Sequence, residues 1–144
     1  MRQHIEYLQN TITTWPGMTA EPHRFGGIEF KLNGVEIGHV HHHGMVDIPF
    51  NSQIRNQLIA EGRADVHHLL KDTGWITFYI RQPEDVERAE WLFRLSYLFH
   101  AGRGRSRTAL AGQIDIPEAV AALCLSESMQ AVFDRVTTRP SATS

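Results

Sequence analysis

The sequence predicts an α+β fold, with helices covering one face of an antiparallel β-meander in a single domain. Two stretches predict the sheet: residues 28–41 alternate between apolar and polar side chains, and residues 75–80, "WITFYI", are aromatic and β-branched. Apolar residues at helical spacing on either side of these stretches predict the helices. The length of 144 residues fits one domain, since domains typically hold ~100–200 residues.

The first hairpin is predicted from "IEFKLNGVEIGHVH", in which Asn33 and Gly34 are flanked by alternating residues. Asn-Gly favours a two-residue type I′ turn, because both central positions of that turn need positive φ. The turn fixes the register, and the apolar pairs then share one face. The expected pairs are Leu32 with Val35, Lys31 with Glu36, Phe30 with Ile37, Glu29 with Gly38, and Ile28 with His39.

A second hairpin is predicted with its turn at His43-Gly44. Its register pairs His39 with Ile48 and Val40 with Asp47. His39 and His41 then continue the apolar face, His42 lies on the opposite face, and His43 lies in the turn. Asp47 is therefore expected opposite His39 and His41, where it is a poor ligand for a site that they share.

Helices are predicted over four stretches. The first contains Ile5, Leu8 and Ile12, the second follows an Asn51 N-cap and ends near Gly62, and the third spans roughly residues 82–102. The fourth covers 117–136. We divide the chain into an α+β domain at 1–101, a basic Gly/Arg linker at 102–116, this last helix, and a disordered tail at 137–144.

Composition excludes several classes of protein. The net charge of −2 argues against a dedicated nucleic-acid binder, although Arg94, Arg103, Arg105 and Arg107 make one region basic. The N-terminus lacks the apolar core of a signal peptide, and no apolar run reaches the ~20 residues that span a bilayer. We expect a cytoplasmic protein that does not bind membranes. The single cysteine, Cys124, excludes an intrachain disulfide and is expected to be buried in a helix.

Histidine is the residue type that carries candidate chemistry, with nine in the chain. His39 and His41 form an H-x-H pair on one strand, roughly 7 Å apart at the backbone given a rise of ~3.3 Å per residue. Imidazoles bind divalent transition metals and transfer protons near neutral pH. We take His39, His41 and His68 as candidate catalytic residues. His39, His41 and His67 are the candidate metal ligands. The alternative is that these rings are incidental, at an open end of the sheet.

A second group of residues is a candidate for ligand binding. Arg24, next to His23 in "PHRFGG", can hold a phosphate or carboxylate, and Arg55 lies in the first turn of the second helix. With His67, these complete the candidate ligand-binding set. The two glycines of this stretch also have a simpler explanation, since they allow a bulge or twist at the start of a strand.

The stretch from "PHRFGGIEFKLNGVEIGHVH" through "DIPF", "EGRADVHHLL" and "TGWITFYI" to "RLSY" resembles the "luciferase domain" family of small bacterial and fungal proteins. The similarity covers roughly residues 16–100. The order of elements, with Trp75 in a strand and Ser96-Tyr97 closing a helix, is also similar to the MmcQ/YjbR-like fold. The second similarity implies a small α+β domain with helices on one face of an antiparallel sheet. Neither similarity reaches the residues after about 101.

Together, these patterns predict a small soluble domain whose histidine- and arginine-lined pocket binds or acts on an unidentified small molecule. Whether it is an enzyme stays open. A divalent transition metal is the candidate cofactor. The alternative is a non-catalytic interaction domain that binds nucleic acid or another partner, although the net charge argues against nucleic acid.

Overall fold

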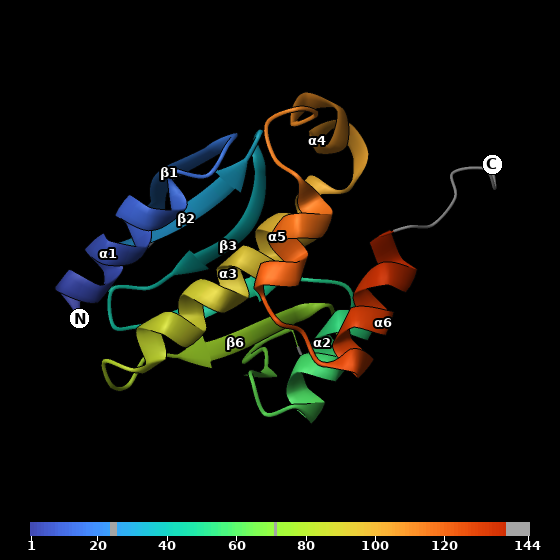
Figure 1. Ribbon diagram of the computed structural model, residues 1–144. Coiled ribbons are helices and arrows are strands. Elements are labelled where there is room, and N and C mark those ends of the chain that lie inside the picture. Colours follow the sequence, from blue (N-terminus) through green and yellow to red (C-terminus); the bar gives the residue numbers. More distant parts are fainter. Residues whose placement is uncertain (24–25, 71, 138–144) are drawn as a thin grey trace.

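A computed structural model describes residues 1–23, 26–70 and 72–137 (Figure 1). The described residues form six helices and six strands, and all six strands belong to one open antiparallel sheet in the order β1-β2-β3-β4-β6-β5. The predicted α+β class is confirmed. The strands are β1 (Met18–His23), β2 (Gly27–Leu32), β3 (Val35–Val40), β4 (Met45–Pro49), β5 (Asp65–Val66) and β6 (Trp75–Tyr79). The helices are α1 (Arg2–Ile12), α2 (Ser52–Ala60), α3 (Asp85–Ala101), α4 (Gly104–Ala109), α5 (Ile116–Ala122) and α6 (Glu127–Thr137).

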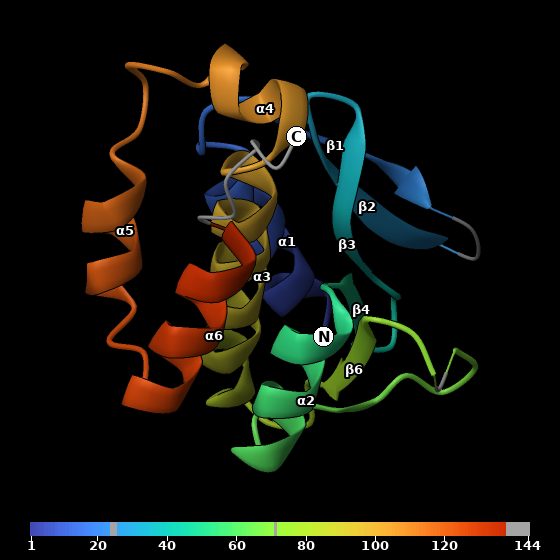
Figure 2. The same cartoon turned by 90° about the vertical axis from the view of Figure 1, so that its right-hand side faces the viewer.

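The helices lie on one side of the sheet, as the view in Figure 2 shows. The long helix α3 packs against β2, β3 and β4, and α1 packs beside α3. The side chains between these layers are almost wholly apolar, among them Phe30, Ile48 and Phe93. Burial of this surface drives the layers together, at about 25 cal/mol per Å² of apolar area. No helix among the described residues covers the other face of the sheet, and we call it the open face.

Three of the predicted helices form as expected, the third being α3 over Asp85–Ala101. Helix α1 buries Ile5, Leu8 and Ile12. At the start of α2, the Asn51 side chain accepts a hydrogen bond of 2.9 Å from the backbone N–H of Ile54, as an N-cap should. Strand β1, which contains Pro22, was not predicted from the sequence. It lies at the edge of the sheet, where proline is tolerated.

The first hairpin keeps its predicted register for two pairs only. Leu32 lies opposite Val35 and Lys31 opposite Glu36, but a β-bulge then leaves Ile37 unpaired and places Phe30 opposite Gly38. The predicted pairing of Ile28 with His39 is therefore wrong. A shift of one residue moves every following side chain to the other face of a strand. His39 consequently lies opposite Glu29, on the open face.

The second hairpin also differs by one residue from the prediction. His39 pairs with Asp47 and Val40 with Val46, and the His41 N–H donates to the Met45 carbonyl at 2.8 Å. Four residues, 41–44, lie between these strands, the last being Gly44 at φ +99°, so the turn is not the two-residue type. The prediction that His39 and His41 continue the apolar face is wrong. The prediction that Asp47 faces away from them is wrong as well.

The C-terminal part differs from the sequence prediction in two respects. The basic stretch contains helix α4, and the single helix expected over 117–136 is two helices, α5 and α6. The break falls at Cys124, which has φ +54° and is exposed, so its predicted burial in a helix is wrong. Ser126 restarts the helix by accepting the Met129 N–H at 3.0 Å. The division of the chain at residues 101, 116 and 136 stays a prediction, and most of the expected tail lies outside the described residues.

Among the residues that the structure describes, no helix combines the length and the apolar character that crossing a bilayer requires.

Candidate functional site

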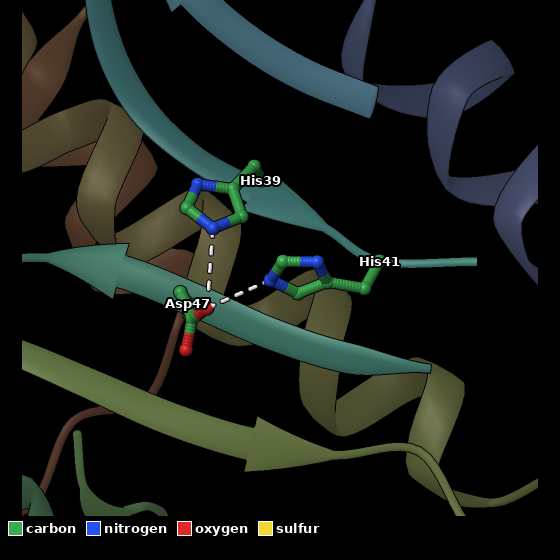
Figure 3. Close-up of side chains that lie close together, drawn as sticks. All are labelled: His39, His41 and Asp47. Carbon is green, nitrogen blue, oxygen red and sulfur yellow. Dashed lines mark hydrogen bonds and ion pairs between the residues drawn. The ribbon is translucent and has the colours of Figure 1, made fainter. Parts of the chain in front are cut away.

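The imidazoles of His39 and His41 converge on one carboxylate, Asp47, on the open face of the sheet (Figure 3). His39 belongs to β3, His41 follows it by two residues, and Asp47 lies on the neighbouring β4. The Nε2 atoms of His39 and His41 lie 3.1 and 3.0 Å from the same oxygen, Asp47 Oδ2. Asp47 is only 1% exposed, so its charge depends on these partners rather than on water.

Two further side chains fix the orientation of this group. The Thr77 hydroxyl on β6 donates a hydrogen bond of 2.8 Å to Asp47 Oδ1, which leaves Oδ2 for His39 and His41. Glu36 Oε2 lies 2.6 Å from Nδ1 of His39, so that ring lies between two carboxylates. Both contacts follow from strand pairing, because Thr77 lies opposite Asp47 and the bulge brings Glu36 and His39 to the same face.

The segment between β5 and β6 brings two more imidazoles to Asp47. His67 Nε2 lies 3.4 Å from Oδ1, and His68 Nε2 lies 3.4 Å from Oδ2. His67 Nδ1 accepts hydrogen bonds from the backbone N–H groups of Leu69 and Leu70, at 3.0 and 2.9 Å. A neutral His67 ring therefore carries its proton on Nε2. His67 therefore anchors the loop between β5 and β6 beside Asp47.

His23, at the end of β1, extends the cluster on its other side. Its ring stacks on that of His39, with centroids 4.0 Å apart, and its Nδ1 lies 3.0 Å from Glu29 Oε1. It does not reach Asp47, so its role here is to pack against His39.

The electrostatics of the group differ from one histidine to the next. Burial lowers the pKa of His39, but hydrogen bonds to Asp47 and Glu36 outweigh burial and raise the pKa to about 9. Burial outweighs the Asp47 contacts for His41 and His67 and lowers the pKa of each. Burial raises the pKa of Asp47, but hydrogen bonds from His39, Thr77 and His41 outweigh it and hold that pKa well below its usual range.

A cavity of about 350 Å³ opens over this cluster. Its polar side is formed by the histidines and carboxylates, and its apolar side by Trp75 and two leucines of the β5–β6 loop. Leu69 and Leu70 are 76% and 44% exposed, unusually high fractions for leucine. The lining residues are Glu36, His39, His41, Asp47, His67, His68, Leu69, Leu70 and Trp75.

The structure brings four of the predicted site residues together around Asp47: His39, His41, His67 and His68. Arg55 lies apart from this cavity, on α2, where its guanidinium donates to Asn56 Oδ1 at 2.8 Å. Arg24 lies outside the described residues. The functional and metal-binding roles of all these residues stay predictions.

Asp47 is the central residue that sequence reasoning missed. The idealised register of the two hairpins places it on the wrong face. One signal does favour it: a lone acid between Val46 and Ile48 in a short apolar strand is costly unless its charge is paired. Four histidines on nearby segments supply that pairing.

Two sets of side chains have the donors and spacing to hold a metal ion. One is His39, His41 and Asp47, and the other is Asp47, His67 and His68. Within each set, the ligand atoms lie within 4.8 Å of one another. Imidazole nitrogens combined with a carboxylate oxygen suit zinc and the neighbouring divalent transition metals.

Comparison with known proteins covers the middle of the chain. No curated protein matches the sequence. The stretch from the first hairpin turn through most of α3 does match a family model, and it contains every residue that lines the cavity. The MmcQ/YjbR-like resemblance stays a prediction. The predicted family resemblance is confirmed over part of its range: residues 34–96 match the family described as Luciferase domain.

Proposed function

We propose that this cavity binds a small organic molecule and that the imidazole–carboxylate cluster at its base is the reactive end of the site. One observation carries the proposal: four imidazoles from two distant segments surround a single buried carboxylate beneath a partly apolar wall. Ligand sites in proteins combine such walls with a few convergent polar groups. Buried titratable groups with shifted pKa values also concentrate at functional sites.

The chemistry such a site supports is proton transfer to and from a polar group of the ligand. A histidine whose pKa is lowered is neutral at pH 7 and can accept a proton, which describes His41. Asp47 orients that ring and stabilises the charge formed on it. The aromatic ring of Trp75 and the two exposed leucines offer contacts to an apolar part of the ligand.

The test is an NMR titration of the uniformly ¹⁵N-labelled chain with phenol, benzoate and 4-hydroxybenzoate. Probes of this size bind at roughly millimolar concentration. We expect the shift changes to cluster at Glu36, His41, His68, Leu70 and Trp75. Shift changes confined to the arginine-rich cavity between α2, α4 and α6, or the absence of any change, contradict the proposal.

The alternative, a non-catalytic interaction domain, stays a prediction that the same titration addresses. A surface that recognises a macromolecule through scattered polar contacts does not bind small aromatic probes at one concave position. Binding of the probes at the cavity therefore favours a small-molecule site.

A further inference from the structure

We propose that His39 Nε2, His41 Nε2 and Asp47 Oδ2 together bind one divalent transition-metal ion, whose remaining coordination positions face the cavity. The proposal deepens the proposed function, since the ion lies in the same cavity; His41 accepts a proton only while no ion occupies its Nε2. It can be tested without any organic ligand, so the two proposals can fail independently.

The spacing of the three atoms fits coordination. Zinc and related ions lie about 2.0–2.2 Å from nitrogen and oxygen ligands. At those bond lengths, neighbouring ligand atoms lie about 3.0–3.5 Å apart in octahedral or tetrahedral geometry. Asp47 Oδ2 lies 3.0 and 3.1 Å from the Nε2 atoms of the two histidines, and the three atoms lie within 4.8 Å of one another. An ion between them needs only small movements of the side chains.

Two of the three ligands already have the outer contacts that metal sites use. A ligating histidine usually donates its other ring N–H to a carboxylate, as His39 Nδ1 does to Glu36 Oε2 at 2.6 Å. A ligating carboxylate is usually hydrogen-bonded through its second oxygen, as Asp47 Oδ1 is by Thr77 at 2.8 Å. The remaining ligand atoms, His39 Nε2 and Asp47 Oδ2, lie 3.1 Å apart, and Figure 3 shows these two side chains pointing toward one another.

The charges around the site favour a divalent cation. Asp47 and Glu36 carry two negative charges within contact of His39, and Asp47 is almost fully buried. Binding of the ion displaces the Nε2 proton of His39, and with both histidines then neutral a divalent ion balances the two carboxylates. Charge compensation of this kind is what a buried carboxylate requires.

The other two histidines around Asp47 have different roles. The Nδ1 of His67 accepts two backbone N–H groups, so the neutral ring keeps its proton on Nε2, the atom that faces Asp47. We therefore take Asp47 as the third metal ligand, in place of His67, which the sequence suggested. His68 is more exposed than the other cluster residues, with 32% of its side chain accessible, and it lies at the rim of the cavity.

Three protein ligands leave positions open for water and for a ligand's oxygen or nitrogen atom. Because the open side is the cavity, the class of small molecule that fits best has a metal-binding polar group and an apolar or aromatic body. The polar group reaches the ion, and the body meets Trp75, Leu69 and Leu70.

The experiment is a titration of chelator-treated, full-length protein with Co²⁺, followed by visible absorption, and with Zn²⁺, followed by calorimetry. We expect one equivalent of each ion to bind. The variants His39→Ala, His41→Ala and Asp47→Asn should lose this binding. Glu36→Gln and Thr77→Val should keep the stoichiometry and bind about 10- to 100-fold more weakly.

Control variants separate this site from nonspecific binding to histidine. His4→Ala, on α1, and the double variant His42→Ala with His43→Ala should bind Co²⁺ as the wild type does. Circular dichroism must show each variant folded, and Glu36→Gln serves where an alanine variant does not fold. The absence of Co²⁺ and Zn²⁺ binding by folded wild-type protein overturns the proposal. Binding that survives loss of both His39 and His41 also overturns it.

Discussion

The hydroxyl of Ser96 on α3 donates a hydrogen bond of 2.8 Å to the carbonyl oxygen of Ile37, the unpaired residue of the β-bulge in β3. Both residues are fully buried. The helix layer therefore holds the bulge in place. On the opposite face of the sheet, the bulge brings His39 into contact with Asp47. A bulge of this kind re-aims a side chain toward a site.

Loss of the Ser96 hydroxyl should destabilise the fold. In Ser96→Ala, the Ile37 carbonyl loses its donor inside the core, which costs about 1–3 kcal/mol. Urea denaturation measures the change in free energy of unfolding. The exposed Ser52 at the start of α2 is the matched control, and Ser52→Ala should change stability by less than about 0.5 kcal/mol. Equal effects of the two substitutions contradict the role of this hydrogen bond.

Gly38, next to the bulge, should not tolerate a side chain. A Cβ atom there lies 2.7 Å from Phe93 Cε1, and the backbone has φ +149°. We expect Gly38→Ala to destabilise the protein by roughly 1–3 kcal/mol, because strain and overpacking combine. Thermal unfolding compares it with Gly102→Ala, where the nearest atom is 3.6 Å from the added Cβ. If the two variants are equally stable, the backbone at Gly38 does not lie as close to Phe93 as the structure places it.

Much of the fold was accessible from the sequence because local signals specify it. The Asn33-Gly34 turn, the Asn51 cap and the spacing of Ile5, Leu8 and Ile12 each act within a few residues, and each prediction is confirmed. The positions of His39 and Asp47 depend instead on a contact with Ser96, 59 residues away from Ile37. Alternation within a strand cannot reveal such a contact, and one extra residue reverses the face of all that follows.

Stability of the metal-free protein should fall as pH rises from neutral to alkaline. The folded-state pKa of His39 is about 9, above its ordinary value of 6.5, because Asp47 and Glu36 stabilise the charged ring. Because folding raises this pKa, protonated His39 contributes its full stabilisation of the fold below pH 6.5. That contribution is lost as the pH rises through 9. The pKa values of His41 and His67 are lowered, so they stay neutral in this window.

Chemical denaturation of chelator-treated protein across this range measures the effect. The variant His39→Gln is the control, because it cannot gain the charge. It should show a flatter dependence of unfolding free energy on pH than the wild type. Parallel curves for the two proteins show that His39 is not held as a cation.

The β5–β6 loop should depend on His67. The two hydrogen bonds that its Nδ1 accepts, from Leu69 and Leu70, disappear in His67→Ala. We expect the amides of residues 69 and 70 to exchange with solvent faster, by about 5- to 10-fold if each bond contributes about 1 kcal/mol. Hydrogen exchange followed by NMR checks this. In the neighbouring control His68→Ala, unchanged protection is expected, and equal loss in both variants counts against the anchoring role.

The exposed leucines should matter for ligand binding and not for folding. Leu70→Ser removes apolar surface at the cavity rim from a side chain that is already 44% exposed, so stability should change by less than about 0.5 kcal/mol. Affinity for an aromatic probe such as 4-hydroxybenzoate should fall several-fold. Val35→Ser, at a 52% exposed position in the first hairpin, is the matched control. If the two variants have equal affinity for the probe, the apolar side of the cavity does not contribute to binding.

The most direct measurement is anomalous diffraction at the cobalt edge from crystals of Co²⁺-loaded protein. We expect one strong peak on the open face of the sheet, about 2.0–2.2 Å from His39 Nε2, His41 Nε2 and Asp47 Oδ2. A peak bound only to the turn residues His42 and His43, or a loaded crystal with no peak at Asp47, contradicts the assignment of this cluster as the centre of the site.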